Sequence, residues 1–353
     1  MIITTGAGAD ELSGSADTAG AFLTGFARPA GWGRPFWADI NPTLVSTELS
    51  LTTNSPEYDW AQTDETYRFF LFANLGVNLP IWSGDFSGGK FSLCLAAPFI
   101  ISVWLDVFEP VTAPVINTDY RAGAPGIAFL HRFRSPFELF PRWRVGIYNY
   151  SFLLSPFIHE STHIGDELTI YRKDDQLEIT RVNVSYNFSE FVLTVNDPEN
   201  SLRMNHAFRF GLMLLHNVKK GWYSIIPEEA DDKNVIQSHI PFETYFQYQF
   251  QSDSFGSGFQ FILSWELRIR ERYNYPFSYS SEQNNYFENG SFASEALRQS
   301  CLNIFAGVRY NNPESNYFSR TGLGIRAYTG INPHGQFRSQ LFYNQWGIVI
   351  LFE

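Results

Sequence analysis

Apolar and polar residues alternate at every second position over several long stretches of the chain. Between residues 259 and 270 every odd position is apolar, and most even positions are Gln, Ser, Glu or Arg. Residues 67–81 and 302–310 show the same sorting. Only a strand places alternate residues on opposite faces, so these stretches predict β-strands between two unlike surroundings.

The same pattern, read along the whole chain together with its turn residues, predicts about fourteen strands, within a range of twelve to fourteen, and an even count is expected of a bacterial membrane barrel. The strands are expected at 42–52, 66–81, 90–105, 126–133, 143–162, 177–187, 190–197, 203–215, 221–227, 239–251, 257–271, 300–311, 318–330 and 337–352.

The connections between these strands separate into short and long ones. Short turns are expected at 187–190, 217–221 and 252–256, and mostly longer loops at 53–65, 106–125, 163–176, 228–238 and 273–299. Short periplasmic turns that alternate with long outer loops are typical of outer-membrane barrels.

Composition favours a membrane barrel over a soluble one. Aromatic residues make up 17% of the 353 residues, as many as the charged ones, and many fall on alternate positions. No run of about eighteen apolar residues exists that could span a membrane as a helix; the best, 93–105, is short and contains Pro98. A closed barrel satisfies its backbone groups between neighbouring strands. The alternative is a soluble β-sandwich or lipocalin-like barrel with its aromatic residues turned inward, because alternation alone does not say which face meets lipid.

The amino-terminal residues and the charge add smaller constraints. Residues 1–20 have neither a basic start nor an apolar core, so they do not predict a signal peptide. An outer-membrane protein needs one, so we expect the numbering to begin near the mature end, with residues 1–35 as a flexible arm and 36–353 as the barrel. Cys94 and Cys301 are too few for a disulfide framework and fall in predicted strands. A net charge of −11 argues against nucleic acid as a partner.

The carboxy-terminal strand adds a further sign of a membrane barrel. It ends with Phe352 one residue before the terminus. It resembles the carboxy-terminal signal of outer-membrane barrels, although those typically end on the aromatic residue itself.

Candidate chemistry gathers at the end of the strand predicted at 143–162. Polar residues with catalytic or ligand-binding side chains follow one another there: His159, Ser161, His163, Asp166 and Glu167. On the predicted topology this strand runs outward, so the cluster lies at the outer rim.

One interpretation of the cluster is a zinc site, because residues 159–163 match the H-E-x-x-H pattern of metalloproteases. That chemistry needs a helix, whereas Pro156 precedes the motif and Gly165 follows it. In a strand, residues four apart are separated by about 13 Å, too far to share one ion. The pattern therefore predicts no metal site.

A second interpretation is nucleophilic catalysis. His159 and Ser161 are two residues apart and project from one face of a strand, with Cα atoms about 6–7 Å apart. Outer-membrane phospholipase A and lipid A deacylase use a similar H-x-S arrangement at the outer rim, and this segment resembles it. Candidates to orient the imidazole are Asn183, Asn187, Asp166 and Glu167, and calcium is an expected cofactor if the protein hydrolyses lipid.

The direction of the two side chains decides between these interpretations. Strict alternation places His159 and Ser161 on the face opposite Phe152 and Ile158, toward the lumen, whereas lipases of this kind turn them to lipid. A β-bulge near Pro156 would reverse the faces. The simplest alternative is a group of polar rim residues that hydrogen-bond one another without catalysis.

The wider pattern resembles a family of bacterial outer-membrane proteins known only as a domain of unknown function. The likeness covers about residues 34–190 and rests on four blocks: 36–39 (FWAD), 117–125 (NTDYRAGAP), 159–167 (HESTHIGDE) and 182–186 (VNVSY). The family pattern, H-x-S-x-H-x-G-D-E, does not need the glutamate of the zinc motif. The resemblance joins Asp119 and Arg121 to the rim cluster as a charged pair across the vestibule or as a salt bridge that stabilises their loop. It implies no reaction.

The sequence therefore predicts an all-β, antiparallel transmembrane barrel in the bacterial outer membrane. Its expected role is binding, passage or assembly in the envelope, with His163, Asp166, Glu167, Asp119 and Arg121 as ligand-binding residues. The alternative is a lipid acyl hydrolase with Ser161 as nucleophile, His159 as base and Asn183 as the orienting residue. Outer-membrane lipid is the expected partner, with protein partners in an envelope complex as a further possibility. The acidic residues 228–232 are either a solvated loop, which the sequence favours, or a contact for such a partner.

Overall fold

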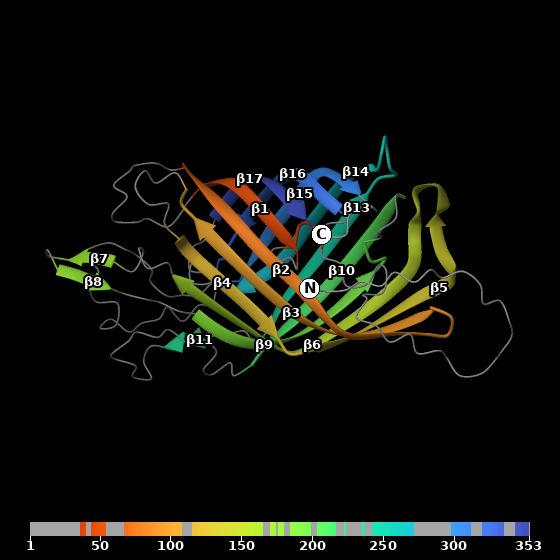
Figure 1. Ribbon diagram of the computed structural model, residues 1–353, viewed down its shortest axis with the longest axis horizontal. Helices are drawn as coiled ribbons and strands as arrows, with labels where there is room; N and C mark the ends of the chain where they lie inside the picture. Colours follow the sequence, from red (N-terminus) through yellow and green to blue (C-terminus); the bar gives the residue numbers. More distant parts are fainter. Residues whose placement is uncertain are drawn as a thin grey trace, which may run out of the picture.

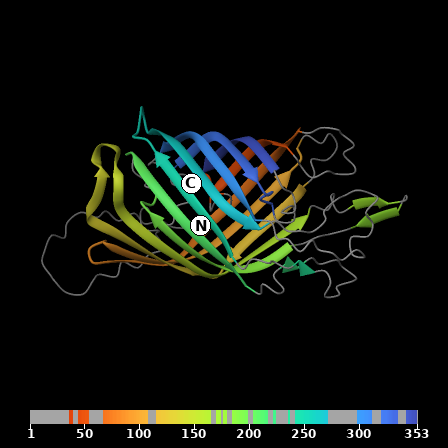
Figure 2. The ribbon, with the colours of Figure 1, turned by 180° about the vertical axis from the view of Figure 1, so that it is seen from behind.

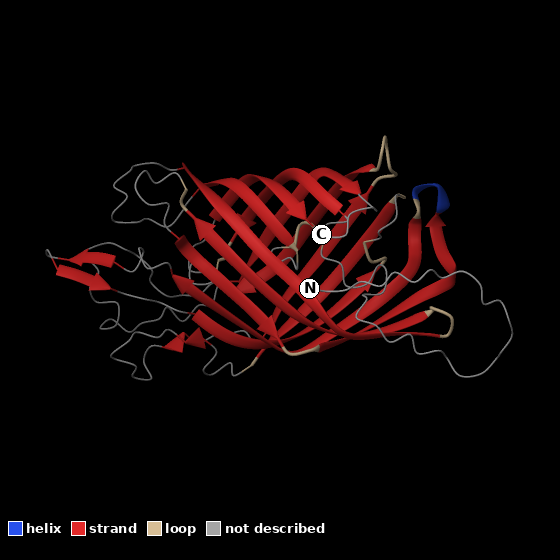
Figure 3. Cartoon of the chain, viewed as in Figure 1, coloured by secondary structure: helices blue, strands red, loops and turns tan. Residues whose placement is uncertain are grey.

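The computed structural model shows a closed antiparallel barrel made almost entirely of strands (Figures 1 and 3). It describes residues 36–39, 44–53, 67–107, 115–164, 170–173, 176–179, 184–198, 203–216, 222–223, 235–236, 242–271, 298–311, 320–334 and 343–352. The predicted arm at residues 1–35 lies outside this part of the chain.

Thirteen strands form the main sheet, and it closes because β2 pairs with β3 as well as with β1. They are β1 (Val45–Thr53), β2 (Tyr67–Phe86), β3 (Phe91–Leu105), β4 (Val115–Gly123), β5 (Gly126–Phe140), β6 (Val145–Ile164), β9 (Val184–Val195), β10 (Asn205–Leu215), β13 (Phe242–Gln251), β14 (Phe259–Glu271), β15 (Arg298–Asn311), β16 (Arg320–Gly330) and β17 (Tyr343–Phe352). Because β4 and β5 follow each other between β3 and β6, they share one position, and the barrel has twelve strand positions.

The remaining elements lie outside this sheet. A short 3-10 helix, η1 (Pro141–Trp143), connects β5 to β6. Two small hairpins stand apart, β7 (Ile170–Lys173) with β8 (Gln176–Ile179), and β11 (Trp222–Tyr223) with β12 (Val235–Ile236). No helix among the described residues is long and apolar enough to cross a membrane.

The predicted strand pattern is confirmed for most of the barrel and differs from the structure in several places. Residues 106–125 were expected to form a loop but contain β4. The turn expected at 187–190 does not exist, because β9 runs through it as one strand. The strand expected at 221–227 contributes only β11, which pairs outside the barrel.

The strand order places short connections at one end of the barrel and longer ones at the other. The short end holds residues 87–90, 141–144, 196–204, 252–258 and 312–319. The other end receives 54–66, 106–114, 165–183, 216–241, 272–297 and 331–342. Since outer-membrane barrels have short periplasmic turns, β6 runs from the periplasmic end to the outer end, as the sequence predicts.

The wall has an apolar outside and a polar inside. Strongly exposed side chains include Leu75, Leu79, Leu267, Leu323, Ile325, Trp346 and Ile348. Buried ones include Glu48, Arg209, Glu243, Gln247, Glu266, Arg268, Arg270 and Arg309. A soluble protein has the opposite arrangement, with its apolar side chains inside. The wall is therefore that of a barrel surrounded by lipid, and the soluble alternative is wrong. Figure 2 shows the wall of β10 and β13 to β15 from behind.

An amino-terminal segment, Phe36–Asp39, fills part of the lumen. The Trp37 amide donates to Gln249 Oε1 at 2.9 Å, and the Ala38 amide donates to Ser264 Oγ at 3.2 Å. The Arg209 guanidinium lies 4.3 Å from the centre of the Phe36 ring. Because the inside of the wall contacts this segment on several strands, we call it the lumen plug. The sequence did not predict this position for the plug.

Candidate active site

The alternation of β6 breaks at Pro156 and Phe157. Before the break, Phe152 and Leu154 are exposed, while Ser155 is buried. Pro156 and Phe157 are then both exposed, and Ile158 is buried again. The register between β6 and β9 shifts at the same place, between Ser155 and Ile158. This is the β-bulge on which the direction of the catalytic candidates depends.

A matching interruption separates β4 from β5 on the neighbouring strand position. Ala124 and Pro125 belong to neither strand, and the Ala124 amide donates to the Phe157 carbonyl at 2.9 Å. A Cβ added to Gly126 would lie 2.8 Å from Ser155 Oγ, so only glycine fits there. Pro125 and Pro156 have no N–H to donate to a neighbouring strand, and each lies in one of the two interruptions. Both β6 and the position shared by β4 and β5 therefore change face at this level.

Beyond the bulge, His159 and Ser161 lie on the lipid-facing side of β6. Their neighbours Glu160 and Thr162 are 9% and 2% exposed and point inward, as Ile158 does. Ser161 pairs in register with Tyr120, which is 41% exposed. The expectation from strict alternation, that the pair faces the lumen, is wrong because of the bulge.

An asparagine on the next strand orients the histidine. His159 Nδ1 lies 2.8 Å from Asn187 Oδ1, and the two residues are register partners. Since an amide oxygen only accepts, Nδ1 carries the hydrogen and Nε2 keeps its lone pair. That tautomer can take a proton from a hydroxyl. Asn187 was one of four predicted candidates, and Asn183 lies outside the described residues.

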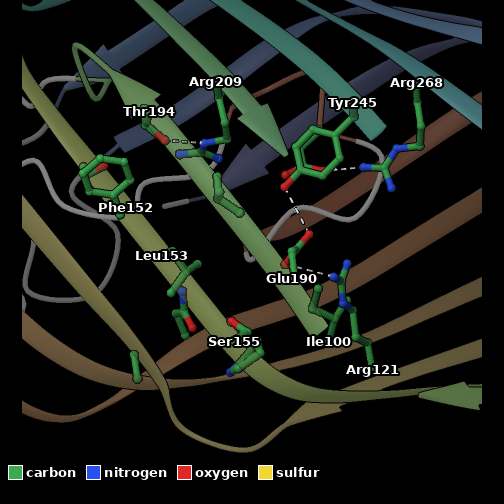
Figure 4. Close-up of a pocket in the computed structure, with 16 residues that line it drawn as sticks. Ile100, Arg121, Phe152, Leu153, Ser155, Glu190, Thr194, Arg209, Tyr245 and Arg268 are labelled. Carbon is green, nitrogen blue, oxygen red and sulfur yellow. Dashed lines mark hydrogen bonds and ion pairs between the residues drawn. The ribbon is translucent and has the colours of Figure 1, made fainter. Parts of the chain in front are cut away.

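The predicted ligand-binding residues Asp119 and Arg121 lie on the other side of the wall. Arg121 Nη2 is 3.3 Å from Glu190 Oε2, and the Tyr245 hydroxyl donates to Glu190 Oε1 at 3.1 Å. Figure 4 shows this network in a cavity of the lumen, below Arg209 and Arg268. The barrel wall thus separates Arg121 from His159 and Ser161.

Asp119 has a different partner from Arg121. Its Oδ2 lies 3.4 Å from His334 Nδ1, and the His334 ring stacks on Phe72 with centroids 5.0 Å apart. The charged pair between Asp119 and Arg121 that the sequence suggested is therefore wrong. Both residues belong to a strand rather than to a loop.

The remaining members of the predicted cluster are described in part or not at all. His163 lies in β6 at the register position opposite Thr118. Asp166 and Glu167 lie outside the described residues. Within the described ranges no three His, Cys, Asp or Glu side chains lie together where they could hold a metal ion. His159 and Glu160 face opposite sides of the wall, so the H-E-x-x-H pattern does not assemble a zinc site.

Sequence reasoning missed a second serine and histidine beside the first pair. Ser189 Oγ lies 2.7 Å from His216 Nε2 and 2.7 Å from the Pro156 carbonyl oxygen. Ser189 was expected in a turn, and His216 lies just after β10. Nothing in the local sequence marks the pair, because it forms only when β10 lies next to β9.

Comparison with known proteins finds similar solved structures at low sequence identity. No family model and no curated protein matches the chain. Among solved structures, outer membrane phospholipase A from Escherichia coli is similar at 11% identity with a TM-score of 0.42, over 89% of this chain and 91% of that one. The translocator domain of the autotransporter NalP from Neisseria meningitidis is similar at 7% identity with a TM-score of 0.36, over 88% and 87%.

The closed antiparallel wall, its apolar outer belt and its polar lumen define the class of this protein. It is an outer-membrane β-barrel protein, located in the bacterial outer membrane.

Proposed function

We propose that this barrel is a lipid acyl hydrolase that acts on outer-leaflet lipid. Ser161 is the nucleophile, His159 is the general base and Asn187 orients the imidazole. The observation that carries the proposal is the bulge at Pro156, which turns His159 and Ser161 to the lipid side of the wall beside Asn187.

The reaction follows from the hydrogen-bonding roles of these three residues. Ser161 Oγ attacks the ester carbonyl carbon while its proton passes to His159 Nε2. The tetrahedral intermediate collapses, the bond to the alcohol oxygen breaks, and that oxygen leaves with the proton. Water then attacks the acyl-serine and gives its proton to His159. Fatty acid is released, and Ser161 recovers its proton.

The place of the site in the wall suggests how an ester would reach it. Leu154, just below the bulge, and Phe157, within it, are 49% and 43% exposed on the side of the membrane belt. A lipid whose acyl chains lie along these residues would place its ester near the outer end of β6. Substrate therefore approaches laterally from the bilayer and does not need to enter the lumen.

Calcium is an expectation carried by the resemblance to lipases. The described residues do not assemble a metal site, so no step is assigned to an ion. Activity measured with calcium and with a chelator tests the expectation separately from the roles of His159 and Ser161.

The test is fatty-acid release from phospholipid and lipopolysaccharide vesicles by the purified full-length protein. We expect release by the wild type and its loss, by about 1,000-fold or more, in Ser161→Ala. Ser151→Ala is the matched control, since Ser151 is a buried serine on the same strand below the bulge. Equal, negligible release by wild type and Ser161→Ala would overturn the proposal.

A further inference from the structure

The bulge at Pro156 is held by a short hydrogen-bonded chain from Ser189 in β9 and His216, which follows β10. Ser189 of β9 lies 2.7 Å from the Pro156 carbonyl oxygen, and the His216 ring approaches Ser189 at the same distance. These contacts lie where the ladder between β6 and β9 is interrupted, between the pairs Ser155 with Glu190 and Ile158 with Phe188.

The direction of this chain follows from its chemistry. A hydroxyl has one hydrogen, and a carbonyl oxygen only accepts. All three groups are satisfied when His216 Nε2–H donates to Ser189 and the Ser189 hydroxyl donates to Pro156. In that arrangement His216 is a donor and cannot take a proton from Ser189, so Ser189 is not a second nucleophile.

His216 also fixes the strand that carries the orienting asparagine. Its main-chain N–H donates to the Asn187 carbonyl at 2.8 Å. Asn187 holds His159 through its side chain. His216 is thus linked to both features that set the site: to the bulge through Ser189, and to Asn187 through its main chain.

We propose that Ser189 and His216 are positioning residues that hold the Pro156 bulge and thereby keep His159 and Ser161 on the lipid face. The expected change in kcat rests on the proposed hydrolase, whereas the role of Ser189 and His216 in holding the bulge does not.

Two pairs of variants distinguish the effect of losing a hydrogen-bond donor from the effect of changing side-chain size. Ser189→Ala and His216→Phe remove the donors, whereas Ser189→Thr keeps a hydroxyl and His216→Gln keeps an N–H donor. We expect the first pair to lower kcat by about 100-fold with KM within about twofold, because a displacement near 1 Å has that cost. We expect the second pair to keep most of the activity.

His206→Phe is the matched control. His206 is a partly exposed histidine at the other end of β10, with its Nδ1 2.8 Å from the Tyr248 hydroxyl. It has the same chemistry as His216 but lies far from the bulge. We expect this variant to have wild-type kcat.

A spin label reports the face of β6 without catalysis. It is attached to Ser161→Cys in the full chain, with the buried Cys94 and Cys301 replaced by alanine. We expect the label to be accessible to oxygen from lipid, and to lose that access in Ser189→Ala and His216→Phe. If those variants keep the lipid access of the label, or keep wild-type kcat, the proposal is overturned. If the wild type itself releases no fatty acid, the proposed hydrolase is wrong. The oxygen accessibility of the spin label then tests by itself whether Ser189 and His216 hold the bulge.

Discussion

The wall of β13 to β15 and the wall of β4 to β9 are built differently, although both belong to one barrel. From β13 to β15 the ladders run without a register shift. Large apolar residues are exposed outside, and the charged residues Glu243, Glu266, Arg268, Arg270 and Arg309 are buried inside. In the wall of β4 to β9, β6 and the position shared by β4 and β5 change face along their length. A shift of one residue is therefore enough to bring polar side chains to lipid without changing the fold.

The regular wall shows what strict alternation produces. Arg268 Nε lies 2.8 Å from Glu266 Oε1 inside the lumen, and Leu267 between them is 41% exposed. Buried charges on this wall contact the plug or one another, as Arg268 does with Asp39 and Glu266. The irregular wall brings His159, Ser161 and Asn187 outside, where a lipid ester is available.

Deletion of Pro156 and Phe157 together should have the largest effect on catalysis. With both residues removed, strict alternation continues from Ser155, so His159 and Ser161 turn into the lumen. We expect the loss of fatty-acid release by about 1,000-fold or more. Heat-modifiable mobility on gels checks that the barrel still folds, and full activity in a folded deletion variant would contradict the role of the bulge.

Asn187→Ala should have the next largest effect on catalysis. Loss of the amide oxygen leaves His159 Nδ1 without its 2.8 Å partner and frees the ring to take the wrong tautomer. We expect kcat to fall about 10- to 100-fold with little change in thermal stability. An unchanged kcat would show that another group orients the imidazole.

Glu266→Ala should affect the regular wall and leave catalysis alone. The substitution removes the carboxylate beside the buried guanidinium of Arg268, which costs about 3 kcal/mol of unfolding free energy. Glu266→Gln keeps an acceptor and should lose less. Urea titration of the barrel in lipid vesicles measures both, and fatty-acid release should stay at the wild-type rate.

Substitution in the plug should have the smallest effect on hydrolysis. Trp37 is 1% exposed, and its ring occupies the space beside Gly322, where an added Cβ would lie 2.3 Å from it. Trp37→Ala opens space in the lumen, so we expect higher ion conductance in planar bilayers and no change in fatty-acid release. Coupled loss of release would mean that substrate uses the lumen.

Sequence alone predicts the regular parts of the barrel well. The alternation in β2, β14 and β15 is visible residue by residue because each face has one solvent. β4 was missed because its nine residues mix exposed and buried positions and end at the Ala124–Pro125 interruption.

The residues of the site could be predicted from the sequence, but the face of the wall on which they lie could not. The spacing of His159 and Ser161 indicates a shared face, whereas the choice of face depends on a bulge held by Ser189 of β9 and by His216, just after β10. These residues are about 30 and about 60 positions away in the sequence. Asn187 could only be named as one of several candidates, since its contact with His159 is set by the register of β6 with β9. The lumen plug has no local signal, because it forms through contacts with distant strands.

Covalent labelling measures directly whether Ser161 is an activated nucleophile on the lipid face. A lipid-soluble fluorophosphonate is added to the folded protein in vesicles, and the modified residue is identified by mass spectrometry. We predict one adduct, on Ser161, that is lost in a His159→Ala variant. No adduct on Ser161, or an adduct on Ser189 instead, would contradict the account.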